Sequence, residues 1–308
     1  MLVVLTGGTG GAKLIEGLSH EVDAAELTIV CNTADDFVLH GLNISPDLDT
    51  ITYTLAGMSD SAQGWGIRED TFTVLAQLEK LGGEAWFKLG DKDIATHLMR
   101  TQLLRAGLRL STVTGQIRDH LGIKARILPM SDDPIETRVD TAEGVISFQE
   151  YFVKRRWQPE VKRVFYDGVE KSRPAAGVVE AIGSAAGIIL CPSNPVTSIG
   201  PILAISGIKD ALQQATATVV GVSPMIGDSA ISGPAHRLMA AQGLAPSALG
   251  AAGSYADFLD GFVIDHADEG LRDELEALKI KVVAASILMK SLADKRRLAR
   301  EVLALIEK

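Results

Sequence analysis

Short apolar runs alternate with longer amphipathic segments along most of the chain. Five of these runs are rich in β-branched and aliphatic residues and end at polar, Pro- or Gly-containing turns: residues 2–5, 27–31, 187–191, 217–222 and 261–264. Continuous apolar runs of this length are typical of strands that are buried on both faces of a parallel sheet. A predicted helix over residues 12–19 completes a βαβ opening. The pattern therefore predicts an α/β fold with a mainly parallel sheet.

The pattern changes over residues 50–126, where helical periodicity replaces the apolar runs. Helices are predicted over residues 70–81 and 94–106. We expect this segment to be a mainly helical insertion between two parts of the core, residues 1–49 and 127–308.

Residues 145–164 hold much of the aromatic content of the chain together with a local run of basic residues. They are predicted to form an edge hairpin or an arm. The stretch 148–166 is a candidate interface, and we expect a homodimer. A covering helix is predicted over residues 292–308.

Composition and charge narrow the class of protein. The 308 residues are 46% hydrophobic and 22% charged, which is typical of a soluble globular chain and excludes a disordered one. The net charge of -9 repels phosphate backbones and anionic lipids, so neither a nucleic acid nor a membrane is an expected partner. Cys31 and Cys191 lie in apolar runs and are expected to be buried thiols. The chain opens on a predicted strand without a signal-peptide pattern, so we expect a cytoplasmic protein.

The strongest local motif follows the first predicted strand and consists of Gly8, Thr9, Gly10, Gly11 and Lys13. A glycine-rich turn that opens into a helix lets main-chain N–H groups approach a phosphate at the positive end of the helix. The motif is not a dinucleotide fingerprint, which needs glycine at the position of the lysine, nor does it have P-loop spacing. The alternative is a tight turn that requires glycine for steric reasons alone.

Acidic residues follow at two places. Asn32, Asp35 and Asp36 come directly after the second predicted strand, where nucleotide-binding folds place polar groups, although a helix cap explains the acids equally well. Asp47 and Asp49 form an i,i+2 pair, and in an extended conformation both carboxylates point the same way. Two converging carboxylates near a phosphate loop suit Mg²⁺, whereas the alternative is a helix cap.

Two further features belong to the predicted carboxyl edge of the sheet or to its insertion. Ser193, Asn194 and Ser223 lie in loops after predicted strands and suit a sugar, a base or a phosphate. Asp93 and His97 share one helix face, but two ligands do not make a metal site, so His97 is expected to be a hydrogen-bonding residue in the cleft or a helix-surface partner of Asp93. The chain has no GxSxG elbow and no HExxH motif, which leaves phosphoryl-group chemistry on a nucleotide-like ligand as the best interpretation.

Eight motifs together resemble the 2-phospho-L-lactate transferase and phosphoenolpyruvate transferase family of deazaflavin-coenzyme biosynthesis. They span most of the chain in the expected order: GGTGGAK at 7–13, NTADD at 32–36, ISPDLDT at 44–50, WGIREDTF at 65–72, KLGDKDIATH at 88–97, LPMSDDPIET at 128–137, PSNPVTSIGPIL at 192–203 and VSPMIG at 222–227.

The resemblance implies a Rossmann-like, three-layer nucleotide-binding core and a Mg²⁺-dependent transferase. Such an enzyme moves the phosphoester unit of a GDP-linked three-carbon acid to the terminal ribityl hydroxyl of 7,8-didemethyl-8-hydroxy-5-deazariboflavin (Fo) and releases GMP. The product is coenzyme F-420-0 or its dehydro form. Lactate, enolpyruvate and glycerate are all possible acids.

The resemblance also implies roles for particular residues. Asp49 and Lys88 correspond to positions that contact the deazaflavin, and Asp91 and His97 belong to the same expected acceptor site. Asp49 is the expected principal Mg²⁺ ligand, with Asp47 or Asp35 assisting. Asp49, Lys88 and Asp36 form the expected catalytic set, in which Asp36 or His97 is the candidate base. The expected donor site comprises Gly8, Thr9, Gly10, Gly11, Lys13, Asn32, Ser193, Asn194 and Ser223.

Two other functions remain open from the residues alone. An NAD(P)-type oxidoreductase would use the same glycine loop with the acids at 35–36, but no pair of groups for hydride transfer is evident. A nucleotide-binding regulator would share the fold without turnover.

Overall fold

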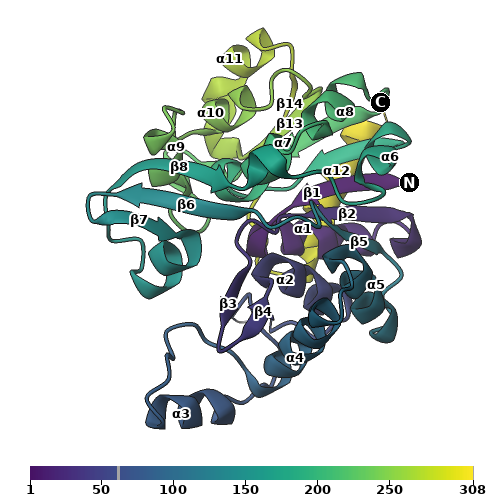
Figure 1. Cartoon of the computed structure of the whole chain (residues 1–308). Coiled ribbons are helices and arrows are strands. Elements are labelled where there is room, and N and C mark those ends of the chain that lie inside the picture. Colours follow the sequence, from purple (N-terminus) through teal and green to yellow (C-terminus); the bar gives the residue numbers. More distant parts are fainter. Residues whose placement is uncertain (61–62, 308) are drawn as a thin grey trace.

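The computed structural model describes residues 1–60 and 63–307 and is built on a seven-stranded sheet (Figure 1). Every neighbouring pair of its strands is parallel. The strands are β1 (Leu2–Thr6), β2 (Leu27–Cys31), β5 (Arg126–Pro129), β9 (Gly187–Leu190), β10 (Thr218–Val222), β13 (Gly261–Ile264) and β14 (Lys281–Ala284). The predicted α/β fold is confirmed, and all five predicted runs are strands of this sheet. The two edge strands, β5 and β14, were not predicted.

The order of the strands locates the expected ligand site. Across the sheet they run β14-β13-β10-β9-β1-β2-β5. The chain winds outward from β1 through β2 to β5 and then continues on the other side through β9, so the direction of winding reverses between β1 and β9. In doubly wound sheets ligands bind outside the carboxyl ends of the strands at this reversal. The loops after β1 and β9 therefore border the expected site.

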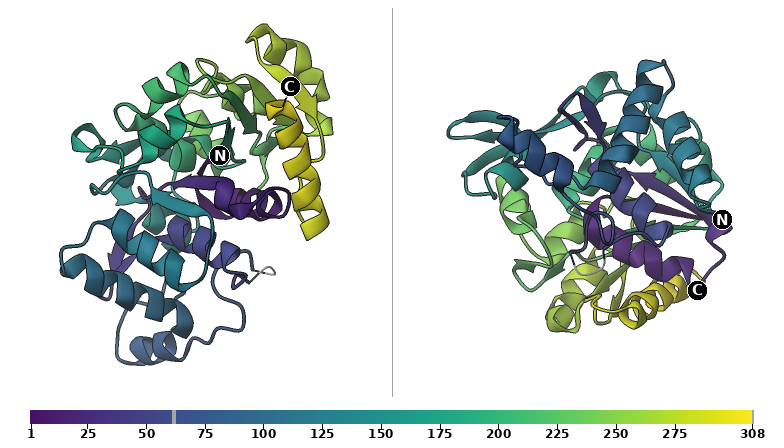
Figure 2. Two further views of the ribbon diagram at one scale, coloured as in Figure 1. Left: turned by 90° about the vertical axis from the view of Figure 1, so that its right-hand side faces the viewer. Right: turned by 90° about the horizontal axis from the view of Figure 1, so that it is seen from below.

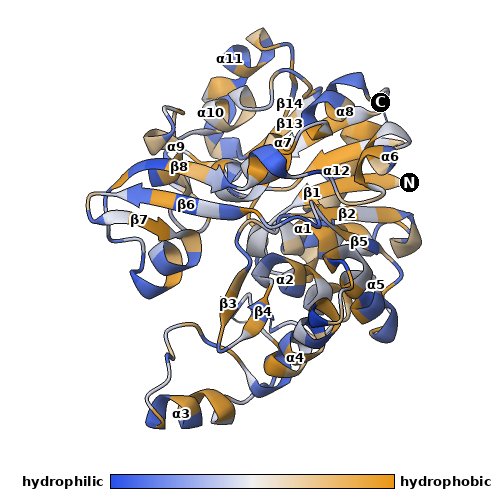
Figure 3. Ribbon diagram, viewed as in Figure 1, coloured by the Kyte–Doolittle hydropathy of each residue, from blue (hydrophilic) through white to orange (hydrophobic). Residues whose placement is uncertain are grey.

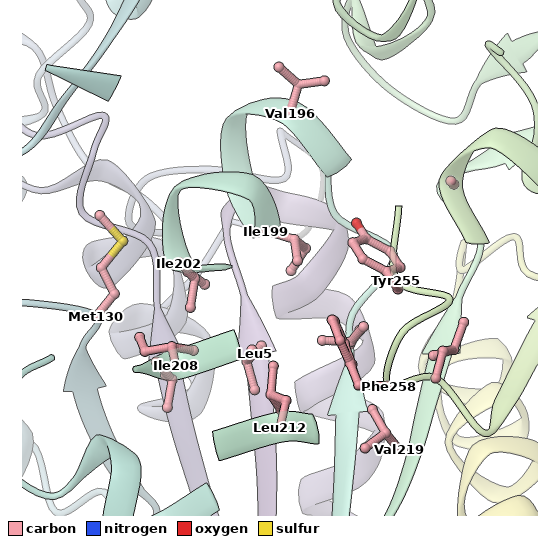
Figure 4. Packing of buried hydrophobic residues seen from close by; sticks show 14 of the residues in the cluster. Leu5, Met130, Val196, Ile199, Ile202, Ile208, Leu212, Val219, Tyr255 and Phe258 are labelled. Carbon is pink, nitrogen blue, oxygen red and sulfur yellow. The ribbon is translucent and has the colours of Figure 1, made fainter. Parts of the chain in front are cut away.

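Helices cover both faces of the sheet and give three layers (Figure 2). Because neighbouring side chains of a strand point to opposite faces, Leu5 belongs to one apolar core and Val4 to the other. Figure 4 shows part of the first core, and the strands of the sheet are mostly orange in Figure 3. The first core is covered by α6 (Val178–Gly183), α7 (Gly200–Ala204), α8 (Ile208–Gln214), α9 (Ala235–Ala241), α10 (Ala248–Gly253) and α11 (Arg272–Ala277). The second is covered by α1 (Gly8–Ser19), α2 (Pro46–Leu55) and α12 (Leu292–Ile306).

The segment between β2 and β5 carries a short hairpin and four helices. These elements are β3 (Phe37–Leu39), β4 (Leu42–Ile44), α2, α3 (Thr73–Lys80), α4 (Asp91–Arg105) and α5 (Leu110–His120). α2 packs against α1 and contributes Leu48 and Ile51 to the second core. The boundary expected between residues 49 and 50 therefore falls inside a helix of the core. α3 and α4 extend away from the sheet (Figure 1).

Two aspartates fix the starts of α3 and α4. Asp91 accepts hydrogen bonds from the N–H groups of Thr73 (3.2 Å) and Val74 (3.0 Å), and Asp70 accepts from those of Lys92 (2.8 Å) and Asp93 (3.1 Å). Each carboxylate thus caps the helix on the far side of the connecting loop. This is why α3 begins later than predicted and α4 earlier.

A three-stranded antiparallel sheet, here called the arm, stands beside the main sheet (Figure 1). Its strands lie in the order β7-β6-β8 and are β6 (Glu136–Thr141), β7 (Gly144–Ser147) and β8 (Val161–Asp167). A π-helical turn, Glu150–Lys154, connects the last two strands. The arm predicted over residues 145–164 is therefore present, but β6, which completes it, was not predicted. Its role as an interface stays a prediction.

The remaining predictions concern the termini and the thiols. α12 confirms the covering helix, although it ends at Ile306 and residue 308 lies outside the described residues. Cys31 and Cys191 are free and buried, as expected. Within residues 1–60 and 63–307, no helix is long and apolar enough to cross a membrane. Shorter elements are β11 (Met225–Ile226), β12 (Ser229–Ala230) and helical turns at Ala24–Glu26, Val169–Lys171, Pro195–Ile199 and His266–Leu271.

Candidate active site

The loops after β1 and β9 meet at the carboxyl edge of the sheet. The Ser193 hydroxyl donates to the Gly7 carbonyl (2.7 Å) and accepts from the Gly7 N–H (3.3 Å). Glycine allows this approach, because a Cβ on Gly10 would lie 2.7 Å from the Pro192 carbonyl oxygen. Gly7, the N-cap residue of α1, has no side chain that could cap the helix, and the main chain of Gly8 hydrogen-bonds to the Asp47 carboxylate. The steric explanation of the glycines therefore applies, and anion binding at this turn stays a prediction.

A cavity of about 690 Å³ opens beside this turn. Its size is within the usual range for small-molecule sites. Gly8, Thr9, Gly10 and Lys13 line it from α1, and Ser193 and Asn194 line it from the loop after β9. The topology and the cavity thus place most of the predicted donor residues together.

Asp35 and Asp47 lie together beside the glycine loop. The Asn32 amide nitrogen links them, donating to Asp47 Oδ2 at 2.9 Å and to Asp35 Oδ2 at 3.2 Å. Burial raises the pKa of Asp47 to about 6, against hydrogen bonds from Asn32 and the main chain of Gly8 that lower it. Burial and the nearby Asp47 charge raise the pKa of Asp35 well above its usual range. Hydrogen bonds from the side chains of Thr137 and Asn32 oppose this rise in the pKa of Asp35.

The extended conformation predicted for Asp47 and Asp49 is wrong. Pro46 is the first residue of α2, and both acids lie in the first turn of that helix. Proline is favoured at this position because its missing N–H would have no partner there. Residues two apart on a helix point about 200° away from each other. The two carboxylates accordingly have different neighbours.

Asp49 forms a buried ion pair with Arg100 of α4. Arg100 Nη1 donates to Asp49 Oδ2 at 3.0 Å, and Arg100 Nη2 pairs with Oδ1. Arg100 Nη1 also lies 3.2 Å from His97 Nδ1. Because arginine only donates, this contact requires an unprotonated Nδ1 and places the hydrogen of a neutral His97 on Nε2.

The predicted contact between Asp93 and His97 is present, with 3.3 Å between His97 Nε2 and Asp93 Oδ1. The Tyr53 hydroxyl donates to the same carboxylate oxygen at 2.5 Å. Asp49, Asp93 and His97 offer potential ligand atoms within 4.8 Å of one another. Asp49, however, is already neutralised by Arg100.

Aromatic rings form two walls of the cavity. Trp86 and Phe87 come from the loop before α4, with ring centroids 5.7 Å apart in an edge-to-face arrangement. Phe148 and Phe152 come from the arm and stack with centroids 5.4 Å apart. Lys88 lines the cavity beside the first wall and is exposed.

The family model described as 2-phospho-L-lactate transferase CofD matches residues 2–300. The chain belongs to that family. A phosphoenolpyruvate transferase of Streptomyces griseus is 44% identical over 99% of this chain and 98% of its own length. A 2-phospho-L-lactate transferase of Methanosarcina mazei is 42% identical over 97% of this chain and 98% of its own. The resemblance stated above is confirmed, and the chain is a transferase.

Among solved structures, a UPF0052-family protein from Bacillus halodurans has a TM-score of 0.65 to this chain. The two chains are 16% identical and each is 98% covered. At that identity the likeness supports the fold alone, including the Rossmann-like core.

Not every residue predicted for the site of this CofD-family chain reaches the cavity. The Asp36 carboxylate accepts a hydrogen bond from the Ser45 hydroxyl at 2.6 Å, and the Ser223 hydroxyl donates to the Met225 carbonyl at 3.0 Å. In the described part of the chain, five predicted residues are outside its lining: Gly11, Asn32, Asp36, Asp91 and Ser223. Asn32 acts indirectly by holding the acids, and Asp91 by capping α3. The roles predicted for all five residues stay predictions.

The sequence analysis missed Arg100, Tyr53 and the arm residues. Arg100 had a usable signal, because Asp93, His97 and Arg100 follow i, i+4, i+7 spacing and share one face of a helix. A buried arginine on an otherwise acidic face indicates an ion-pair partner. Phe148 and Phe152 had no comparable signal, since nothing local shows that the arm faces the cavity.

Proposed function

We propose that this CofD-family chain transfers the phosphoester unit of a GDP-linked three-carbon acid to the terminal ribityl hydroxyl of Fo and releases GMP. The acid is lactate, enolpyruvate or glycerate, and the product is coenzyme F-420-0 or its dehydro form. The family and the names of its relatives support the reaction class. The observation that carries the proposal is that one cavity joins the N-terminus of α1 and an acid pair to two aromatic walls.

The donor fits the end of the cavity at the sheet. The N–H groups at the start of α1 and the Lys13 ammonium suit the diphosphate. Asn194 Oδ1 accepts from the N–H groups of Val196 (2.9 Å) and Thr197 (3.4 Å), which fixes the side chain at the cavity surface. Its amide nitrogen, for which no described residue is an acceptor, suits the guanosine.

The acceptor fits the aromatic walls of the cavity. The flat deazaflavin ring needs apolar surfaces of matching shape, and the Trp86–Phe87 and Phe148–Phe152 walls offer them. Lys88 supplies a positive charge beside the first wall. The ribityl chain would then extend from the rings toward the donor phosphate.

The residues also fit a Mg²⁺ ion. Asp35 and Asp47 are buried together with raised pKa values, so a cation would relieve the repulsion between the two carboxylates. We therefore assign the ion to Asp35 and Asp47 rather than to Asp49. When bound, Mg²⁺ supplies charge neutralisation at the transferring phosphate.

The protein's own contribution is positioning and electrostatics. The ribityl hydroxyl oxygen forms a bond to the phosphorus that carries the acid and gives up its proton to solvent, and the anhydride bond breaks with its electron pair leaving on GMP. Such transfers need little covalent help from the protein. The α1 N–H groups and Lys13 stabilise negative charge on the diphosphate, and Arg100 holds Asp49 in one orientation at the cavity wall.

The proposal is tested by incubating the purified chain with Fo, Mg²⁺ and each GDP-linked acid in turn. GMP release and the mass of the deazaflavin product are followed, with an EDTA-treated sample as the control. A product of the expected mass with one donor supports the proposal and identifies the acid. Binding of guanine nucleotides without transfer from any of the three donors would contradict it and favour a regulator.

A further inference from the structure

Arg156 is the charged residue that the arm contributes to the cavity. Its neighbour Arg155 is fully engaged, with Nη2 at 2.7 Å from Glu150 Oε1 and Nη1 paired with Glu143. Arg156 lines the cavity, is exposed, and forms no ion pair with any described carboxylate. Of these two consecutive arginines, Arg155 forms ion pairs within the arm and Arg156 is free to contact a ligand.

The main chain at this point is strained. Arg156 and Trp157 have φ values of 50° and 49°, which is the left-handed region that bulky side chains rarely adopt. Arg155 alone separates them from the π-helical turn, another irregularity that is frequent at functional sites. Trp157 is held on both sides, since its N–H donates to the Tyr151 carbonyl (2.8 Å) and its carbonyl accepts from Arg237 Nη1 (3.0 Å). Strain that the surroundings hold in this way is concentrated at ligand sites.

The charges of the proposed donor leave one group without a partner. Three lysine or arginine side chains of the described chain line the cavity: Lys13, Lys88 and Arg156. Lys13 stands at the α1 N-terminus, where the diphosphate fits, and Lys88 stands at the acceptor wall. The carboxylate of the three-carbon acid has no assigned partner, and Arg156 is the remaining cation.

We propose that Arg156 binds the donor carboxylate; this rests on the function proposed above. A guanidinium offers two parallel N–H groups that match the two oxygens of a carboxylate, which an ammonium cannot do. Lactate, enolpyruvate and glycerate all carry this group, so Arg156 would orient the acid without selecting among the three. Selection must then depend on contacts at the second and third carbons.

Arg156→Gly is the most informative variant, because glycine adopts positive φ without strain. It should fold as well as the wild type, which circular dichroism and the melting temperature check. Arg156→Lys keeps the positive charge and loses the two parallel N–H groups of the guanidinium. Arg163→Gln is the matched control, since Arg163 is an exposed arginine on β8 that packs over Phe165 and does not line the cavity.

Calorimetry without acceptor measures the Kd of a GDP-linked lactate or enolpyruvate donor, and of GDP, which lacks the carboxylate. Arg156→Gly should raise the donor Kd by about tenfold or more and leave the GDP Kd nearly unchanged. Arg156→Lys should give an intermediate donor Kd, and Arg163→Gln should bind both ligands like the wild type. An unchanged donor Kd would overturn the assignment, and so would a parallel rise for donor and GDP, which would place Arg156 at the diphosphate. If the wild type binds the donor in this pattern but transfers nothing to Fo, the proposed reaction fails while the carboxylate assignment stands.

Discussion

Asp47→Asn should stabilise the ligand-free protein at neutral pH and abolish transfer. Asp47 is 8% exposed, and burial raises the pKa of its carboxyl from 3.8 to about 6. When folding raises the pKa of an acid, its protonated form favours the folded state and its ionised form opposes folding. Its contribution is complete below pH 3.8 and is lost as the pH rises through about 6.

The size of the effect follows from the pKa. At roughly 1.36 kcal/mol per pKa unit, the rise from 3.8 to about 6 corresponds to about 3 kcal/mol of lost stability at pH 7.5. At pH 5 the folded carboxyl is still mostly protonated, and the loss is roughly half as large. Asparagine has nearly the same shape, can still accept from Asn32 and carries no charge. We therefore expect Asp47→Asn to gain up to these amounts.

Urea unfolding in EDTA at pH 5 and pH 7.5 measures the difference. The matched control is Asp91→Asn, because hydrogen bonds from Thr71 and from the N–H of Val74 lower the pKa of Asp91, so its neutralisation should destabilise the protein at pH 7.5. Added Mg²⁺ should raise the stability of the wild type and not that of Asp47→Asn. The reasoning is refuted if Asp47→Asn is no more stable than the wild type at pH 7.5, or if its advantage is as large at pH 5.

Three further predictions concern other parts of the site. Arg100→Ala should lower the free energy of unfolding by about 3–5 kcal/mol, because it leaves the buried Asp49 carboxylate unpaired; urea unfolding checks this. Gly10→Ala should lower the free energy of unfolding by at least about 1 kcal/mol, because its Cβ would lie 2.7 Å from a main-chain oxygen. The control is Gly115→Ala in α5, where a Cβ has free space; it should raise the free energy of unfolding by roughly 0.5–1 kcal/mol in the same assay. Lys88→Ala should raise the KM for Fo by about tenfold and leave the donor Kd unchanged; equal effects on both substrates would contradict its place at the acceptor wall.

Five of the seven strands of the central sheet were predictable, because they are buried on both faces and therefore appear as uninterrupted apolar runs. β6 was missed for the opposite reason. Its residues, Glu136–Thr141, alternate between buried and partly exposed, as is typical of an antiparallel strand with one solvated face. A search for continuous runs does not detect that period.

Helix starts were less predictable than helices. Asp70 lies 22 residues before Lys92, whose N–H it accepts at the start of α4, and Asp91 lies 18 residues after Thr73 at the start of α3. Neither aspartate precedes the helix it caps in the way that local capping rules require. Only the folded loop brings each carboxylate to its helix, so the sequence could not place these boundaries.

The acids of α2 show how one residue of register decides the chemistry of this site. Because the helix begins at Pro46, Asp47 turns toward Asn32 and the glycine loop, while Asp49 turns toward Arg100. Asp49 is neutralised by the protein itself, from a helix of the insertion. Asp47, together with Asp35, keeps a negative charge that no described side chain neutralises, and it does so beside the α1 N-terminus. The structure thus leaves its uncompensated charge at the one end of the cavity where a cation and a diphosphate would compensate each other.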